Sequence, residues 1–144
     1  MACVCGSLVP GTVSVRLCDQ CLRMILRGCE KGREYWLPYP GHPSYHVSNL
    51  GRVRSPRKIL KPQADGGSGK YLTVTINRKR RRVSHLVLET YIGLCPLGEM
   101  ACHWNGDKYD NALMNLRWAE DADNKADMIR QGRGWWQRRE LDRV

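Results

Sequence analysis

The sequence predicts an α+β fold with a small cysteine-bearing segment, an antiparallel basic β-sheet and a compact strand–strand–helix unit near the C-terminus. Two observations lead to this prediction. Residues 45–84 alternate between apolar and polar side chains and are divided by Gly, Asn and Pro, which is typical of short strands. In residues 100–125, polar turn formers separate two strand-like stretches, and a helix-like stretch follows. The length of 144 residues fits about one domain with a small appendage.

The net charge of +10 is concentrated in one segment. Residues 51–84 contain eleven Lys or Arg and one acid, Asp65, whereas residues 99–127 contain seven acids and three bases. A concentrated positive charge favours a polyanionic partner, and a solvated basic face is the alternative. The basic segment therefore suits DNA phosphates, and the acidic segment tolerates a divalent cation.

No apolar run approaches the roughly 20 residues that a membrane-spanning helix needs. The N-terminus also lacks the basic and apolar pattern of a secretory signal. We therefore expect a cytoplasmic protein with no membrane partner. Disulfides are rare in the cytoplasm, so the seven cysteines need another explanation.

Four cysteines near the N-terminus form two close pairs, Cys3 with Cys5 and Cys18 with Cys21. Two such pairs on either side of a hairpin-sized loop can place four thiolates around Zn²⁺, which predicts a zinc-knuckle-like segment over residues 1–30. The first pair is one residue shorter than the usual CxxC spacing. Cys29 is therefore either an alternative ligand or a free thiol, and a set of cysteines without metal is the other interpretation.

The other elements follow from local patterns along the chain. A Gly- and Pro-rich connector is expected over 30–43, and helices over 22–27, 85–93 and 119–131. The expected strands are 13–17, 45–47, 52–55, 59–62, 71–76, 80–84, 99–104 and 116–118. In the helix over 85–93, Leu86, Thr90 and Leu94 form a stripe that is expected to face the core.

The basic sheet is expected to contact the backbone of double-stranded DNA, because Arg and Lys bind phosphates without reading sequence. The expected contacts are Arg52, Arg54, Arg57, Lys58, Lys61, Arg78, Lys79, Arg80, Arg81 and Arg82.

His103, Asn115 and Asn124 form the candidate catalytic group. Hydrolysis of a phosphodiester needs a base that deprotonates water and a cation that neutralises developing oxyanion charge. His103 has the side chain whose pKa suits a base. The Asn115 amide can orient the imidazole, directly or through backbone, and the Asn124 carbonyl offers an oxygen to Mg²⁺.

The same stretch resembles the HNH endonuclease motif in the small branch found in phages and mobile elements. The matching positions are His103, Asn105-Gly106-Asp107, Asn111, Asn115-Leu116, Trp118 and Asp123-Asn124. The upstream part resembles a modular DNA-binding segment often found ahead of this motif, through YHVSNLGRVRS at 45–55 and VSHLVLETYIG at 83–93. The resemblance covers about residues 34–132.

The resemblance implies a ββα-metal nuclease unit in which His103 is the general base, Asn115 positions it and Asn124 helps to bind Mg²⁺ or Mn²⁺. It also implies products with 5′-phosphate and 3′-hydroxyl ends, and a location in host cytoplasm if the chain is phage-encoded. The predicted divisions are a knuckle over 1–30, a basic sheet over 31–84, a nuclease core over 85–132 and a basic aromatic tail over 133–144.

Some relatives have Asp just before the histidine as a metal ligand, whereas this chain has Cys102, a poor partner for a hard cation. Asp107 or Asp123 would then supply an acid. His85 is interpreted as a helix-start or phosphate-contacting residue, and His42 and His46 as structural. Cys95 and Cys102 are interpreted as partly buried thiols.

We therefore predict a metal-dependent HNH DNA endonuclease that acts as a nicking monomer. The rival interpretation is a non-catalytic DNA-binding or assembly protein that retains the fold, such as a partner of phage packaging machinery, and Cys102 supports this rival. A zinc protein that binds RNA also fits the positive charge, but this interpretation does not explain the arrangement of His103, Asn115 and Asn124.

Overall fold

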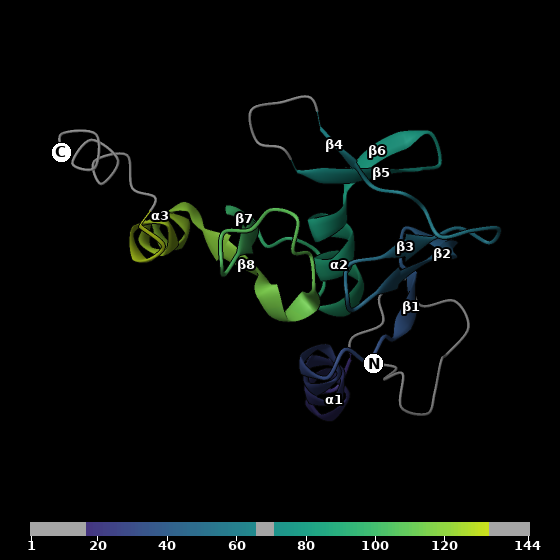
Figure 1. Ribbon diagram of the computed structural model, residues 1–144, viewed down its shortest axis with the longest axis horizontal. Helices are drawn as coiled ribbons and strands as arrows, with labels where there is room; N and C mark the ends of the chain where they lie inside the picture. Colours follow the sequence, from purple (N-terminus) through teal and green to yellow (C-terminus); the bar gives the residue numbers. More distant parts are fainter. Residues whose placement is uncertain (1–16, 66–70, 133–144) are drawn as a thin grey trace.

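The computed structural model describes residues 17–65 and 71–132 of the chain. Within these residues, small antiparallel sheets surround a central helix, and two further helices lie on the outside (Figure 1). The predicted α+β class with small antiparallel sheets is therefore confirmed. None of the helices in the described ranges is long and apolar enough to cross a membrane.

The first sheet has the order β1-β2-β3, with bounds Trp36–Tyr39, His42–Ser48 and Val53–Arg54. The connector expected over 30–43 was wrong, because it contains β1 and the start of β2. Leu37 pairs with Val47, and the ring of Tyr39 is buried in the core. Pro38 is tolerated in β1 because β1 is an edge strand of this sheet.

The second sheet has the order β4-β5-β6, with bounds Gln63–Ala64, Leu72–Ile76 and Lys79–Arg82. Asn77 and Arg78 form the tight turn between β5 and β6, with φ of 47° and 65°. The strand expected over 59–62 was wrong, since only Ile59 forms an isolated bridge, with Arg54. The single basic sheet that we expected is thus two sheets.

Helix α2 (Val83–Tyr91) packs against both sheets and against the C-terminal strands. It begins earlier than expected, because Val83 and Ser84 belong to the helix and not to the preceding strand. Leu86, Val87 and Leu88 are fully buried, whereas Leu94 is 81% exposed. Leu94 therefore does not belong to the core-facing stripe, since the helix ends at Tyr91.

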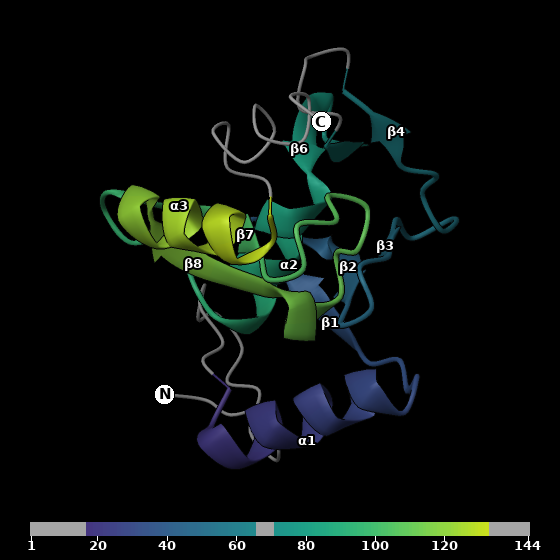
Figure 2. The same cartoon turned by 60° about the vertical axis from the view of Figure 1, so that its left-hand side comes forward.

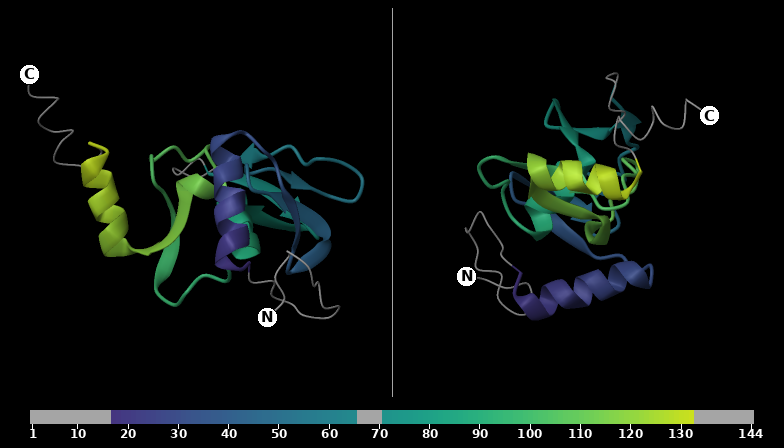
Figure 3. Two further views of the ribbon diagram at one scale, coloured as in Figure 1. Left: turned by 90° about the horizontal axis from the view of Figure 1, so that it is seen from below. Right: turned by 90° about the vertical axis from the view of Figure 1, so that its left-hand side faces the viewer.

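Helix α1 (Asp19–Glu30) is longer than the helix expected over 22–27, because it begins at the Cys18 cap. Cys21 N donates a hydrogen bond to Cys18 Sγ at 3.4 Å. Ile25 and Cys29 enter the core, and the helix lies beside the short 3₁₀ helix η1 (Leu113–Asn115) (Figures 2 and 3). The strand expected over 13–17 lies outside the described residues except for Leu17, which is not in a strand.

The C-terminal unit consists of β7 (Glu99–His103), η1, β8 (Leu116–Glu120) and α3 (Asp121–Arg130). Its strand–loop–strand–helix order is the one predicted. The helix start expected at Ala119 was wrong, because Ala119 pairs with Met100 and Glu120 pairs with Glu99 in the β7–β8 hairpin.

One hydrophobic cluster runs through the described residues, from Ile25 of α1 through both basic sheets and α2 to Leu116 of β8. The divisions at 30/31 and 84/85 remain predictions, and the buried side chains on either side of them pack together. The candidate site therefore rests on the same core as the basic sheets.

Candidate active site

His103 is the last residue of β7, where it pairs with Leu116 of β8, and its side chain is 8% exposed. The next residue is held from two directions. Trp104 N donates to Asn115 O at 2.9 Å, and Gln131 Nε2 donates to Trp104 O at 2.5 Å. The backbone that carries His103 is thus fixed both by the following loop and by the end of α3.

The His103 imidazole contacts Asn111, with 2.9 Å between Nε2 and the side-chain oxygen Oδ1. An amide oxygen only accepts hydrogen bonds, so Nε2 must carry the proton. In the neutral ring the lone pair then lies on Nδ1. The contact therefore selects the tautomer that has Nδ1 available as a base.

Asn115 has a different role from the direct contact that we considered. Its buried side chain accepts from Asn105 N at 3.1 Å and donates to Asn105 Oδ1 and to Asp110 O, each at 2.9 Å. These bonds tie together the two ends of the loop that follows His103. Asn115 is thus linked to His103 through the backbone of Trp104, and Asn111 makes the side-chain contact.

Burial lowers the pKa of His103 below its ordinary value of 6.5, and the hydrogen bond to Asn111 partly opposes this shift by raising the pKa. Nearby Asp110 and Asp107 also raise the pKa, and Lys108 lowers it. The net direction is downward, so the imidazole is neutral and able to accept a proton at neutral pH.

The contact with Asn111 predicts a change in the pH dependence of any DNA cleavage. Asn111→Ala is expected to move the acidic limb of the rate profile to lower pH, because it removes a bond that raises the pKa of His103. The plateau rate should fall by about 10²-fold, the size expected when a catalytic group is misplaced by ~1 Å. Nicking rates measured between pH 4.5 and 8.5 check both effects.

Asn111→Asp is the matched comparison, since it keeps an oxygen near Nε2 and adds a negative charge. It should move the acidic limb to higher pH. Identical limbs in the wild type and both variants would show that His103 is not the titrating base.

Tyr71 connects the basic sheet to His103. Its ring lies 6.3 Å from the imidazole, and two cations lie over the same ring, Arg82 at 4.1 Å and Lys108 at 4.8 Å. Two positive charges from different elements thus lie against Tyr71, and Lys108 is near enough to His103 to lower its pKa. Sequence reasoning missed Tyr71 and Lys108, although Lys108 is one of only three bases in the acidic segment over 99–127.

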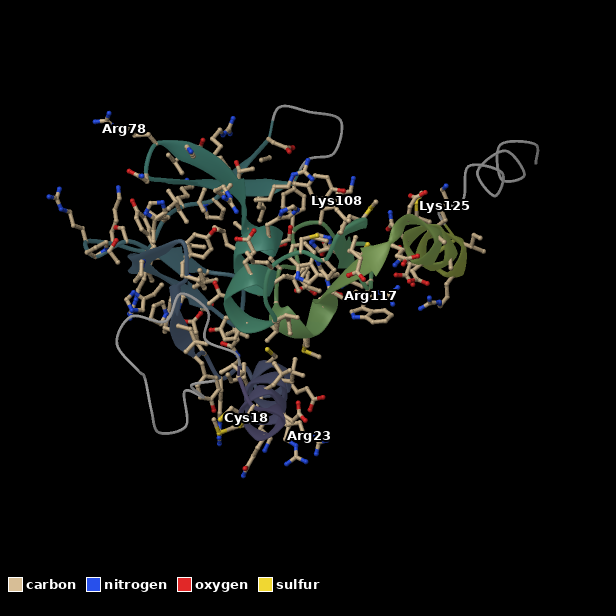
Figure 4. All side chains as sticks on the ribbon, turned by 180° about the vertical axis from the view of Figure 1, so that it is seen from behind. Cys18, Arg23, Arg78, Lys108, Arg117 and Lys125 are labelled. Atoms are coloured by element: carbon tan, nitrogen blue, oxygen red, sulfur yellow. The ribbon has the colours of Figure 1, made fainter. Side chains whose placement is uncertain are left out.

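The ten expected DNA contacts fall into two groups. Arg52, Arg81 and Arg82 form ion pairs with Glu34, Glu89 and Asp65 respectively. The other cations make no ion pair with a carboxylate within the described ranges; they are Arg54, Arg57, Lys58, Lys61, Arg78, Lys79 and Arg80. Arg78 projects from the β5–β6 turn at the edge of the molecule (Figure 4).

The turn after β2 joins the basic region (β1 to β6) to the loop between β7 and β8 (residues 104–115), which we name the catalytic loop after the candidate site beside it. Asn49 is fully buried, and its carbonyl accepts from Leu113 N at 2.8 Å. Its side chain donates to Arg33 O at 3.0 Å and accepts from Tyr35 N at 2.7 Å. Gly51 has φ +89°, and a Cβ at this position would lie 2.8 Å from Asn111 O. This turn therefore packs directly against the residue that contacts His103.

The two residues expected to bind a catalytic cation, Cys102 and Asn124, differ in how suitable their side chains are as ligands. The Cys102 thiol is buried, donates to Met100 O at 3.7 Å and has a raised pKa because of burial. A protonated, soft thiol does not fit a hard cation. Asn124 Nδ2 lies 3.7 Å from Met100 Sδ, which leaves the amide oxygen as its suitable donor. Within the described ranges no group of three or more His, Cys, Asp or Glu could hold a metal ion.

The expected zinc ligands are only partly within the described residues, since Cys3 and Cys5 lie outside them. Cys18 caps α1, and Cys21 is buried. The Cys29 thiol donates to Asn49 O at 3.4 Å and lies in the core. The zinc knuckle remains a prediction.

Parts of this chain are similar to known proteins. Residues 34–77 match the NUMOD4 motif. A protein of Acanthamoeba polyphaga mimivirus named as an uncharacterized HNH endonuclease, L247, is 32% identical over 105 residues, which are 65% of this chain and 26% of that protein. This chain thus spans about a quarter of the relative's length.

The fold is similar to that in a solved structure of DNA binding and cleavage by the HNH homing endonuclease I-HmuI. The TM-score is 0.58 at 24% identity, over 76% of this chain and 67% of that chain. The resemblance to HNH endonucleases is confirmed, and the matched motif contains the signature at 45–55. The matched relative comes from a giant virus and not from a phage.

Proposed function

We propose that this chain, which is related to the HNH endonucleases, hydrolyses phosphodiester bonds of double-stranded DNA with His103 as the general base. The observation that carries the proposal is the 2.9 Å contact of His103 Nε2 with Asn111 Oδ1, because it leaves Nδ1 as the basic nitrogen. The proposal is supported by the two cations over Tyr71, whose ring is 6.3 Å from the imidazole, because a phosphate bound there would need charge compensation.

In the proposed reaction, His103 Nδ1 takes a proton from water as the oxygen attacks phosphorus. The bond from phosphorus to the 3′-oxygen breaks, which leaves a 5′-phosphate, and the departing 3′-oxygen takes a proton from water to become a 3′-hydroxyl. Asn111 holds the imidazole orientation, and Asn115 keeps the loop closed through Asn105. Arg82 and Lys108 hold the phosphate against Tyr71 by charge.

A divalent cation, Mg²⁺ or Mn²⁺, would stabilise the negative charge that develops on the phosphate oxygens. Of the two predicted ligands, we propose that Asn124 binds the cation. Cys102 does not, because its thiol is protonated and buried. Mg²⁺ commonly takes its remaining ligands from water and substrate phosphates, so one protein oxygen is compatible with binding. A structural zinc near the N-terminus is a separate part of the proposal.

Incubation of supercoiled plasmid with the protein tests the function. Nicked circles are expected to accumulate with Mg²⁺ or Mn²⁺ and to be absent with EDTA. A single catalytic unit per chain makes a nicking monomer the expected form, so nicked circles should precede linear DNA. The measurement is the first-order rate of loss of supercoiled DNA.

The second candidate is a DNA-binding protein that retains the fold without activity, such as a component of a packaging complex. It is favoured by the Cys102 thiol at a position where some relatives carry an acid. Binding of duplex DNA without nicking in any divalent cation would establish this function and exclude the nuclease.

A further inference from the structure

We propose that α1 carries a second binding surface for the phosphate backbone of DNA, formed by other cations than those of the basic sheets. The surface is formed by Arg23, Arg27, Lys31 and Arg33, which line one hollow of about 790 Å³ between α1 and the chain that leads to β1. We call it the α1 basic groove. This inference rests on the proposed function for the identity of the polymer.

The α1 basic groove follows from the helical period. Arg23, Arg27 and Lys31 are spaced four residues apart, so they lie along one side of the helix and its C-terminal cap. Three such positions span about 12 Å along the axis. One strand of B-DNA presents roughly three to four phosphates over that distance. The spacing thus suits a charged backbone better than a single small anion.

The fourth cation, Arg33, reaches the groove because the chain turns back after α1. Gly32 has φ +68°, and Arg33 N donates to Gly28 O at 2.7 Å, which folds the chain back along the helix. Gly28 allows this return, because a Cβ there would lie 2.6 Å from the Tyr35 ring. Arg33 is therefore held beside α1 by backbone contacts.

These cations are exposed, and none of the four forms an ion pair with a carboxylate in the part of the chain that the structure describes. Asp19 is the one acid among the residues that line the groove. By contrast, Lys125 on α3 is neutralised by Asp121 at 2.6 Å. Four cations and one acid give this groove a net positive charge, which attracts a polyanion.

A basic amphipathic helix can also bind membranes, but α1 is not free to do so. Its apolar side chain Ile25 is 3% exposed and Cys29 is 9% exposed, so the face that would enter a bilayer is already packed in the core. The side of α1 that is available to a partner carries the four cations and Met24.

The groove lies next to the first sheet, because Arg33 and Tyr35 directly precede β1, but it is apart from the β5–β6 turn. Figure 4 shows Arg23 on α1 at the lower edge of the molecule and Arg78 on the β5–β6 turn at the upper left. DNA that reaches both surfaces must extend beyond the stretch beside His103, or a second segment of DNA must bind at α1. Either arrangement adds phosphate contacts that do not depend on the catalytic loop.

Salt dependence of binding measures these contacts. Fluorescence anisotropy of a long duplex of arbitrary sequence in EDTA gives the slope of log K against log salt concentration. The double variant Arg23→Gln/Arg27→Gln is expected to reduce the magnitude of that slope by about 1.8, since each lost phosphate contact contributes about 0.9. The matched control Lys125→Gln should leave the slope unchanged, and equal melting temperatures show that the variants are folded.

A third variant separates this inference from the proposed function. If Arg78→Gln/Arg80→Gln lowers the slope but the α1 variant does not, the α1 basic groove is a solvated face and the inference is wrong. If neither variant changes the slope, the proposal that this protein binds the DNA backbone is wrong. A loss of affinity for structured RNA but not for duplex DNA would overturn the inference in favour of an RNA surface.

Discussion

Replacement of His103 by alanine is expected to reduce the rate of plasmid nicking by about 10²–10⁴-fold, the usual contribution of a positioned general base. The physical reason is the loss of Nδ1, which the contact between Nε2 and Asn111 leaves as the proton acceptor. The measurement is the first-order nicking rate at saturating protein, in the divalent cation that gives the wild type its highest rate.

His42→Ala is the matched control for this variant. His42 is also partly buried, but it contacts Tyr45 at the start of β2 and belongs to the basic region instead of the catalytic loop. It should leave the nicking rate within about twofold of the wild type. Duplex binding in EDTA should be retained by both variants, which separates a chemical defect from a defect in folding or affinity.

A fully active His103→Ala variant would contradict the role of general base. If His42→Ala were as inactive as His103→Ala, we would attribute the loss of activity to damage to the fold and not to loss of the base. Equal melting temperatures of the two variants and the wild type would show that a loss of nicking is not caused by unfolding.

The order of the C-terminal unit could be predicted from sequence because its turn formers are local. Asn105, Gly106 and Asp107 end one strand, and the apolar residues after Asn115 begin the next. The choice between Asn111 and Asn115 as the partner of His103 could not be made in this way. It depends on the path of the loop, which Asn115 itself sets by binding Asn105 and Asp110.

The basic region was harder to predict, because tertiary contacts outweigh its local signals. Gly and Pro in residues 30–43 indicated a connector, yet β1 forms there as an edge strand whose apolar side chains pack on α2. The Ser48–Gly51 turn was recognised as a turn. Its contact with Asn111 joins residues 60 positions apart, and no local pattern encodes that distance.

Gly51→Ala is expected to lower both stability and cleavage. A left-handed backbone costs an alanine about 1–2 kcal/mol, and overpacking a tight contact costs about 1–3 kcal/mol more. The contact is with backbone, since the new Cβ would lie 2.8 Å from Asn111 O and 2.9 Å from Asn111 C. Asn111 must therefore move relative to His103, and the nicking rate should fall by about 10²-fold in the fraction that remains folded.

Gly98→Ala is the control that isolates the contact with Asn111. Gly98 has φ +83°, close to the +89° of Gly51, but nothing lies within 4 Å of its Cβ position. It should therefore lose only the backbone contribution of about 1–2 kcal/mol in urea unfolding and keep the wild-type nicking rate. Equal effects of the two substitutions on nicking would show that the turn after β2 supports the fold alone. A defect confined to Gly51→Ala would show that the basic region positions the catalytic loop.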